Sequence, residues 1–152
     1  MTSPTPPTGF LHLIVGYDGS PPAVRALDGA VRLMQGRRGR IVVVYVGHLS
    51  STVMLSADAI AQMESDFDQI QKELRAEAAE QLGDYEQPWE FIRRQGSIGD
   101  ELIAVAAGIR DDHPADTVAI IVGSSSSAAH RLVGSVAVHL ARHAPVPLMI
   151  VP

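Results

Sequence analysis

Glycines and small hydroxyl residues follow an apolar segment near the end of the chain. Residues 118–122 are continuously apolar, and Gly123 and the four serines of 124–127 come next. Gly134 and Ser135, which lie eleven and twelve positions after Gly123, open a further run with helical spacing. Where a strand leads through such a loop into a helix, unpaired backbone N–H groups and hydroxyls converge and hold phosphate. The stretch therefore predicts an anion site.

Plainer interpretations of the same residues stay open. A serine beside Gly134 also suits an ordinary N-cap of the following helix. A low-complexity serine loop over 124–127 needs no ligand, although its hydroxyls could donate to phosphate. Among the neighbouring side chains, His130 and Arg131 are cationic or switchable, and Arg131 is a candidate phosphate contact.

Other kinds of chemistry find little support. His139 and His143 have the spacing of two helical metal ligands, but the glutamate of the H-E-x-x-H zinc motif is missing, which favours two exposed histidines. Lys72 is the single lysine and follows no glycine-rich loop, so a Walker P-loop is excluded, and no G-x-S-x-G elbow occurs. The chain has no cysteine, which excludes disulfides and thiolate sites. We predict no catalytic residue and no metal site.

Composition indicates one globular domain. The 152 residues are 46% hydrophobic and 19% charged, and the net charge of −5 disfavours nucleic acid or an anionic membrane as the main partner. The basic cluster of Arg37, Arg38 and Arg40 is interpreted as a solvated helix end, with an anion-contacting patch as the alternative. Without a signal peptide or an apolar span, a cytoplasmic location is expected. Residues 1–9, rich in proline and threonine, are expected to be a mobile leader, and residues 10–152 a single domain.

Apolar runs alternate with segments of helical period, which predicts an α/β domain with a mostly parallel sheet. The expected strands are 11–17, 40–46, 88–95, 117–123 and 147–151. Helices are expected at about 20–36 and 56–82, around Leu102 and Ala106, and around Val136 and Leu140. The long helix should carry one apolar face, made of Ile60, Met63, Phe67, Ile70, Leu74 and Leu82.

A ligand in an open parallel sheet lies beyond the carboxyl ends of the strands, where the chain direction switches. In this chain the switch falls between the first and fourth strands, so Asp18 and Gly123 would both reach the crevice. Asp18 also suits a turn or helix N-terminal carboxylate beside Gly19 and Ser20, and the two roles are compatible.

Several of these segments resemble the universal stress protein (UspA-like) family. They are residues 13–20, 96–103, 122–124, 134–136 and 142–151, and the resemblance covers nearly the whole chain after the first ten residues. It implies a doubly wound, five-stranded sheet of order 3-2-1-4-5 with helices on both faces. It also implies a non-catalytic stress-response or regulatory module, and a homodimer formed through the last strand. An exposed apolar edge strand would favour the same pairing.

The resemblance further implies a site for ATP or another adenine nucleotide, with its magnesium ion. The matching positions are Gly16, Asp18, Val46, Val122, Gly123, Ser126, Gly134, Ser135 and Val136. In family members that hold ATP, the match to Val46 meets adenine. The matches to Gly123, Ser126 and 134–136 surround phosphates and ribose.

The chain departs from the family's ATP-binding pattern, G-x2-G-x9-G-[S/T], at two points. Ser126 stands where the second glycine belongs, and Gly134 follows Gly123 by eleven positions instead of thirteen. Serine lacks the backbone freedom of glycine and adds a Cβ where phosphate approaches. Two alternatives therefore stay open: a nucleotide-free dimer that acts only through contacts with an unknown protein partner, and a slow nucleotide hydrolase. The hydrolase has no arranged base, nucleophile or metal ligands to support it.

Overall fold

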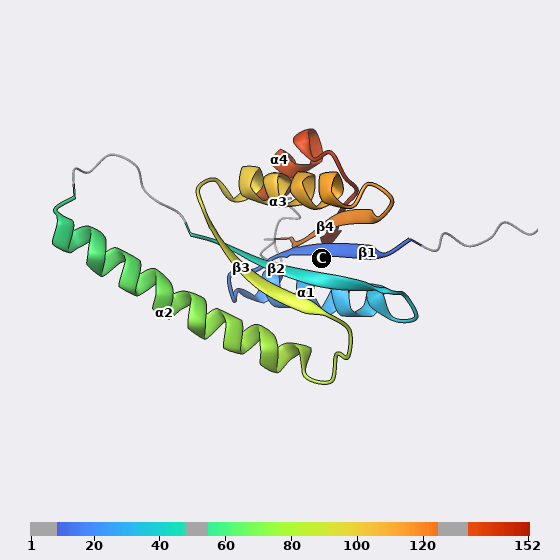
Figure 1. The fold of residues 1–152 in the computed structure, drawn as a ribbon, viewed down its shortest axis with the longest axis horizontal. Helices are drawn as coiled ribbons and strands as arrows, with labels where there is room; N and C mark the ends of the chain where they lie inside the picture. Colours follow the sequence, from blue (N-terminus) through green and yellow to red (C-terminus); the bar gives the residue numbers. More distant parts are fainter. Residues whose placement is uncertain (1–8, 48–54, 125–133) are drawn as a thin grey trace, which may run out of the picture.

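The computed structural model describes residues 9–47, 55–124 and 134–152, and these form one five-stranded sheet and four helices (Figure 1). The strands are β1 (Leu11–Gly16), β2 (Gly39–Gly47), β3 (Trp89–Gln95), β4 (Thr117–Gly123) and β5 (Leu148–Val151). The helices are α1 (Pro21–Met34), α2 (Ala57–Leu82), α3 (Ile98–Asp112) and α4 (Ser135–His143). The sheet order is β3-β2-β1-β4-β5 and every pairing is parallel. The predicted fold class and strand order are confirmed.

Two hydrophobic clusters lie on opposite faces of the sheet, because successive side chains of a strand point to opposite sides. Leu13 and Val15 of β1 pack with residues of α1 and α2. Ile14, between them, packs with residues of α3 and α4. Figure 1 shows the same arrangement, with α1 and α2 on one side of the sheet and α3 and α4 on the other. The central strands are thus covered on both faces, as their continuously apolar sequences predict.

The predicted apolar face of α2 is buried only in its C-terminal half. Leu74, Ala78 and Leu82 are buried, whereas Ile60 is 44% exposed and Ile70 is 38% exposed. The first turns of α2 extend past the sheet (Figure 1), whereas Phe67, further along the helix, is half-buried beside Gly47 at the end of β2. Helical spacing reveals that a face is apolar, but the length of the sheet decides how much of that face is buried.

The interpretation of the arginine cluster as a solvated helix end is correct for two of its residues and wrong for Arg40. Arg37 and Arg38 are exposed after the end of α1, and Arg37 donates to the carbonyl oxygen of Leu33. Arg40 instead lies in β2 and pairs with polar side chains of the neighbouring strands. A residue two positions into an inner strand faces its neighbours rather than solvent.

Of the predicted leader, only Gly9 falls within the described residues. No helix in the described part of the chain combines the length and the apolarity needed to cross a membrane.

Candidate functional site

A cavity of about 320 Å³ opens at the carboxyl ends of β1, β2 and β4. It lies between the two strands where the chain direction switches, which is the predicted place for a ligand. The first turns of α1, α3 and α4 complete its walls. Most of the wall is apolar, and a few polar groups are set into it, which is the usual composition of a small-molecule site.

The structure brings eight of the nine predicted nucleotide-binding residues together in the wall of this cavity. They are Gly16, Asp18, Val46, Val122, Gly123, Gly134, Ser135 and Val136. The ninth, Ser126, lies outside the described residues, as do His130 and Arg131. The eight share one cavity, and their role in binding a nucleotide stays a prediction.

The N-terminus of α4 supplies hydrogen-bond donors to the cavity. Gly134 is the N-cap, with φ −60° and ψ 159°, and no side chain caps the helix within the described residues. Ser135 is the first helical residue and is exposed. The N-cap predicted at this pair of residues is therefore Gly134 and not Ser135. The backbone N–H groups of residues 135–137 have no intrahelical acceptor and carry the positive end of the helix dipole, an arrangement that suits an anion.

The other two helices that border the cavity are less suited to an anion. Ser20 caps α1 by accepting the N–H of Ala23 at 3.4 Å, and Pro21 and Pro22 have no N–H to donate. The first turn of α3 carries Asp100 and Glu101, whose charges repel phosphate. Among the described elements, the N-terminus of α4 is therefore the best candidate for an anion contact.

Asp18 combines both of its predicted roles. Its Oδ1 accepts the backbone N–H of Ser20 at 3.0 Å, which closes the turn after β1. The same exposed side chain also lines the cavity. The carboxylate is thus held in place by the turn and still reaches the ligand space.

Tyr17 is a cavity residue that the sequence analysis missed. Its side chain is 4% exposed, and burial raises the pKa of its phenol, with smaller contributions from the carboxylates of Glu77 and Asp18. The signal that could have revealed it is its position, one residue beyond β1 and directly before Asp18. The other missed lining residues are Ser20, Pro22, Ala23, Val44, Ile98, Leu102 and Ala137. Most of them come from the starts of helices, and Val44 comes from β2.

Gly123 has a packing role in addition to its place in the cavity wall. A Cβ at this position would overlap with the carbonyl group of Pro22. The end of β4 therefore passes directly against the first turn of α1, and only glycine permits this approach. Part of the glycine pattern that predicted a phosphate loop is explained by contact between two elements.

The two histidines of α4 are engaged rather than free to share a metal. His139 Nε2 lies 2.8 Å from Asp100 Oδ1 on α3, and His143 Nδ1 lies 3.0 Å from the carbonyl oxygen of His139. His139 is only 37% exposed, so the prediction of two exposed histidines is correct for His143 alone. The contact with Asp100 ties α4 to α3 beside the cavity.

Solved structures of similar fold include several universal stress proteins. UspA from Lactobacillus plantarum is 19% identical, with 95% of this chain and 99% of the other covered and a TM-score of 0.60. A universal stress protein in complex with cAMP is 22% identical over 95% of this chain and 98% of the other, with a TM-score of 0.63. A family protein from Arabidopsis thaliana with AMP bound is 14% identical over 93% and 90%, also with a TM-score of 0.63. At these identities the likeness shows the fold.

The sequence comparisons give two further results. None of the curated proteins compared with the sequence matches it at a significant level. The model of the universal stress protein family, in contrast, matches residues 9–152, which is the part of the chain that contains the sheet, its four helices and the cavity. The chain belongs to the universal stress protein family.

Proposed function

We propose that this chain is a non-catalytic stress-response module that binds an adenine nucleotide in the cavity between β1 and β4 and acts in the cytoplasm. The observation that carries the proposal is the N-terminus of α4, whose first-turn N–H groups border an apolar cavity. The N–H groups suit a phosphate. The apolar wall, which includes Val46 and Val122, suits a base.

The similar structures support the ligand class. One is described as a complex with cAMP and another as having AMP bound. Both ligands are adenylates with a single phosphate. The positive end of one helix dipole suits the negative charge of one phosphate group. A magnesium ion would accompany a ligand with more phosphates, and Asp18 is the one carboxylate among the described cavity residues that could contact it.

We further propose that the protein is a homodimer formed through β5. This strand lies at the edge of the sheet, and each of its four residues is half-buried. A parallel edge with apolar side chains and unpaired backbone groups favours pairing with a second copy. An unidentified protein partner would then recognise the dimer.

One feature favours a different function, a dimer that holds no nucleotide. Ser126 replaces a glycine of the family's ATP-binding pattern, and the segment between Gly123 and Gly134 is two residues shorter than that pattern. Replacing Ser126 with glycine separates the two functions. If the serine only weakens phosphate binding, Ser126→Gly tightens it; equal or weaker affinity in the variant removes this explanation.

Mass spectrometry of the purified protein, released from any ligand by denaturation, tests the proposal directly. An adenylate at a stoichiometric fraction of the protein, confirmed by calorimetric titration with ATP, AMP and cAMP, is the expected result. Absence of any adenylate together with no heat of binding would favour the nucleotide-free dimer. A phosphate-release assay over hours, with ATP as substrate, tests the slow hydrolase, and release above the buffer rate would contradict a non-catalytic role.

A further inference from the structure

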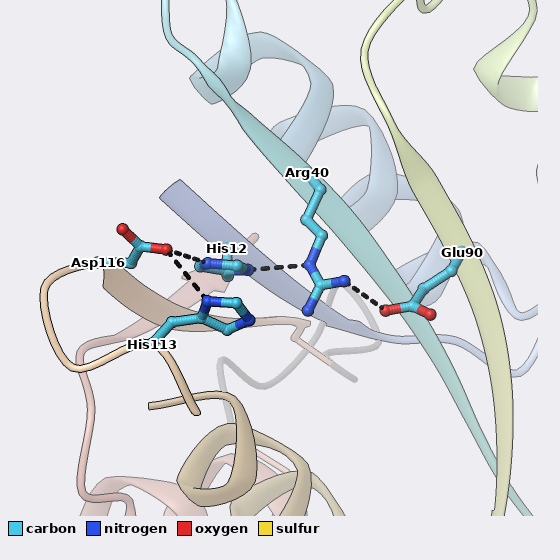
Figure 2. Close-up of polar contacts among 5 residues, drawn as sticks. All are labelled: His12, Arg40, Glu90, His113 and Asp116. Carbon is cyan, nitrogen blue, oxygen red and sulfur yellow. Dashed lines mark hydrogen bonds and ion pairs between the residues drawn. The ribbon is translucent and has the colours of Figure 1, made fainter. Parts of the chain in front are cut away.

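A polar cluster lies at the amino ends of the strands, away from the cavity (Figure 2). His12 Nε2 lies 2.8 Å from Asp116 Oδ2, and Arg40 Nε donates to His12 Nδ1 at 2.9 Å. His113 Nδ1 lies 3.8 Å from the same Asp116 oxygen, and Arg40 Nη1 pairs with Glu90 at 3.1 Å. The cluster thus runs across β3, β2 and β1 to the turn before β4. It has no part in the proposed nucleotide site.

The contacts fix the protonation of His12. Its side chain is 2% exposed, so water does not compete for the ring nitrogens. A guanidinium only donates, and Nδ1 must therefore hold a lone pair while Nε2 carries the proton. That proton is donated to Asp116, and the hydrogen bond is the main cause that lowers the pKa of the carboxyl. In this state His12 is a neutral imidazole with one tautomer.

Three ligand atoms converge beside this ring. His12 Nε2, His113 Nδ1 and the Asp116 carboxylate all lie within 4.8 Å of one another. Zinc binds such atoms at about 2.0–2.2 Å in a tetrahedron, which places two ligand atoms about 3.3 Å apart. The separations of 2.8 Å and 3.8 Å from Asp116 Oδ2 lie on either side of that value. His12 Nε2 and His113 Nδ1 lie within 4.8 Å of each other, so displacements on the order of 1 Å would fit the three atoms around one ion. The two rings, which are stacked at 29°, must also turn so that both nitrogen lone pairs point at the ion.

We propose that His12, His113 and Asp116 form a Zn²⁺ site whose affinity is controlled by Arg40. Two imidazoles and a carboxylate are ligands that zinc accepts, and three protein ligands leave the fourth position for water. His113 is 48% exposed, so the site opens to solvent on that side. The ion would replace the His12 proton between the ring and Asp116.

Arg40 opposes the ion in two ways. To coordinate through Nε2, the His12 ring must carry its proton on Nδ1, where a metal-bound histidine normally donates to an acceptor. Arg40 presents a donor at that nitrogen and adds a positive charge close to a cation. Binding therefore requires Arg40 to leave His12 while the proton moves from Nε2 to Nδ1. Arg40 is 28% exposed and already paired with Glu90 on its other side, so it can turn towards that carboxylate.

Substitutions of Arg40 test the proposal with zinc itself as the probe. In Arg40→Gln the amide oxygen can accept the Nδ1 proton and the charge is gone, whereas Arg40→Lys keeps both a donor and the charge. Calorimetric titration of the full chain with ZnCl₂ should give one site, at least about tenfold tighter in Arg40→Gln than in wild type. Arg40→Lys should show no such gain. Adding His113→Ala or Asp116→Asn to Arg40→Gln should remove the tight binding.

A matched control separates this site from the other pair of histidines. His139→Ala with His143→Ala removes a pair whose rings lie at a similar centroid separation, 4.6 Å against 5.0 Å for His12 and His113, and should leave zinc binding unchanged. Circular dichroism establishes that each variant is folded. Nitrogen NMR of the imidazoles should show the His12 proton moving from Nε2 to Nδ1 when zinc is added. Equal affinity of Arg40→Gln and wild type, binding that survives loss of His113, or loss of binding in the α4 control would each overturn the proposal.

Discussion

Tyr17 lines the cavity, and two carboxylates influence the pKa of its phenol. Tyr17 is 4% exposed, and burial together with the carboxylates of Glu77 and Asp18 raises the pKa of its phenol above the ordinary value of 10.0. A folded-state pKa above the unfolded value means that folding favours the neutral phenol. This contribution to stability is complete below pH 10 and is lost as the pH rises through the folded-state pKa.

Alkaline pH should therefore destabilise the wild type more than the variant Tyr17→Phe, which keeps the ring and has no ionisable group. The measurement is urea unfolding at pH 8 and at pH 11. The control is Tyr45→Phe, since Tyr45 is only half-buried in β2. If Tyr17→Phe loses as much stability between the two pH values as the wild type does, the phenol is not the group responsible.

At the residue scale, site residues that lie in short sequence segments could be predicted, whereas contacts between residues far apart in the sequence could not. Of the eight predicted cavity residues, Asp18, Gly123, Gly134 and Ser135 were found because they lie at the end of a predicted strand or open a predicted helix, and the other four came from the family resemblance. The cluster of His12, Arg40 and Asp116 was not found, since its hydrogen bonds join residues that are 28 and 104 positions apart. A polar residue within an apolar strand, such as His12, was the available signal. The sequence alone does not reveal its partner.

The helix α2 illustrates how packing depends on the layer beneath an element. Leu74 is 8% exposed and belongs to the core with α1 and the sheet. Ile70, one turn earlier in the same helix, is 38% exposed. Both belong to the apolar face that the sequence predicts, so the difference in their exposure arises from the position of the sheet beneath the helix.

Truncation of these two side chains should have unequal costs. Leu74→Ala should lower the free energy of unfolding by about 2–4 kcal/mol, because it leaves a cavity in the core. Ile70→Ala should cost less than about 1 kcal/mol, since little apolar area is lost and alanine favours the helix. Chemical unfolding of both variants measures the difference. Equal costs would show that the exposed surface of α2 around Ile70 is covered in solution, for example by a second molecule.

At the element scale, the apolar runs identified every strand to within two residues, because inner parallel strands are buried on both faces. The helix starts were less certain. Ser20 caps α1 through its hydroxyl, whereas the serine at the start of α4 is preceded by a glycine N-cap. Both Gly and Ser suit an N-cap, so the sequence does not decide between them.

At the scale of the whole molecule, the sheet formed by the described residues has β3 at one edge and β5 at the other, and β5 is the edge proposed to pair with a second copy. Ile150 of β5 and Ile92 of β3 are both partly buried against the cluster shared with α3 and α4. They therefore differ mainly in the edge on which they lie. This gives a matched pair of variants for testing the dimer.

Ile150→Lys should convert the dimer to a monomer, because paired edges would bring two like charges together without water. Ile92→Lys places the same charge at the opposite edge and should leave the dimer intact. Sedimentation velocity at tens of micromolar protein distinguishes the two states. A monomeric wild type, or a dimeric Ile150→Lys, would contradict the proposed interface.

The N-terminus of α4 is the proposed phosphate contact of an adenine nucleotide, and Ser135→Glu tests that contact directly. Ser135 is exposed at the first helical position, where a carboxylate favours the helix dipole and would occupy or repel the phosphate position. Val138→Glu is the matched control, because Val138 is 38% exposed on the same helix and does not line the cavity.

Calorimetric titration with AMP, with thermal unfolding of each variant as a check on folding, provides the measurement. We predict that wild type and Val138→Glu bind AMP alike. Ser135→Glu should bind at least about tenfold more weakly with an unchanged or higher melting temperature, in keeping with the loss of charged hydrogen bonds. Equal AMP affinity in Ser135→Glu and wild type, or no AMP binding by the wild type, would contradict the account.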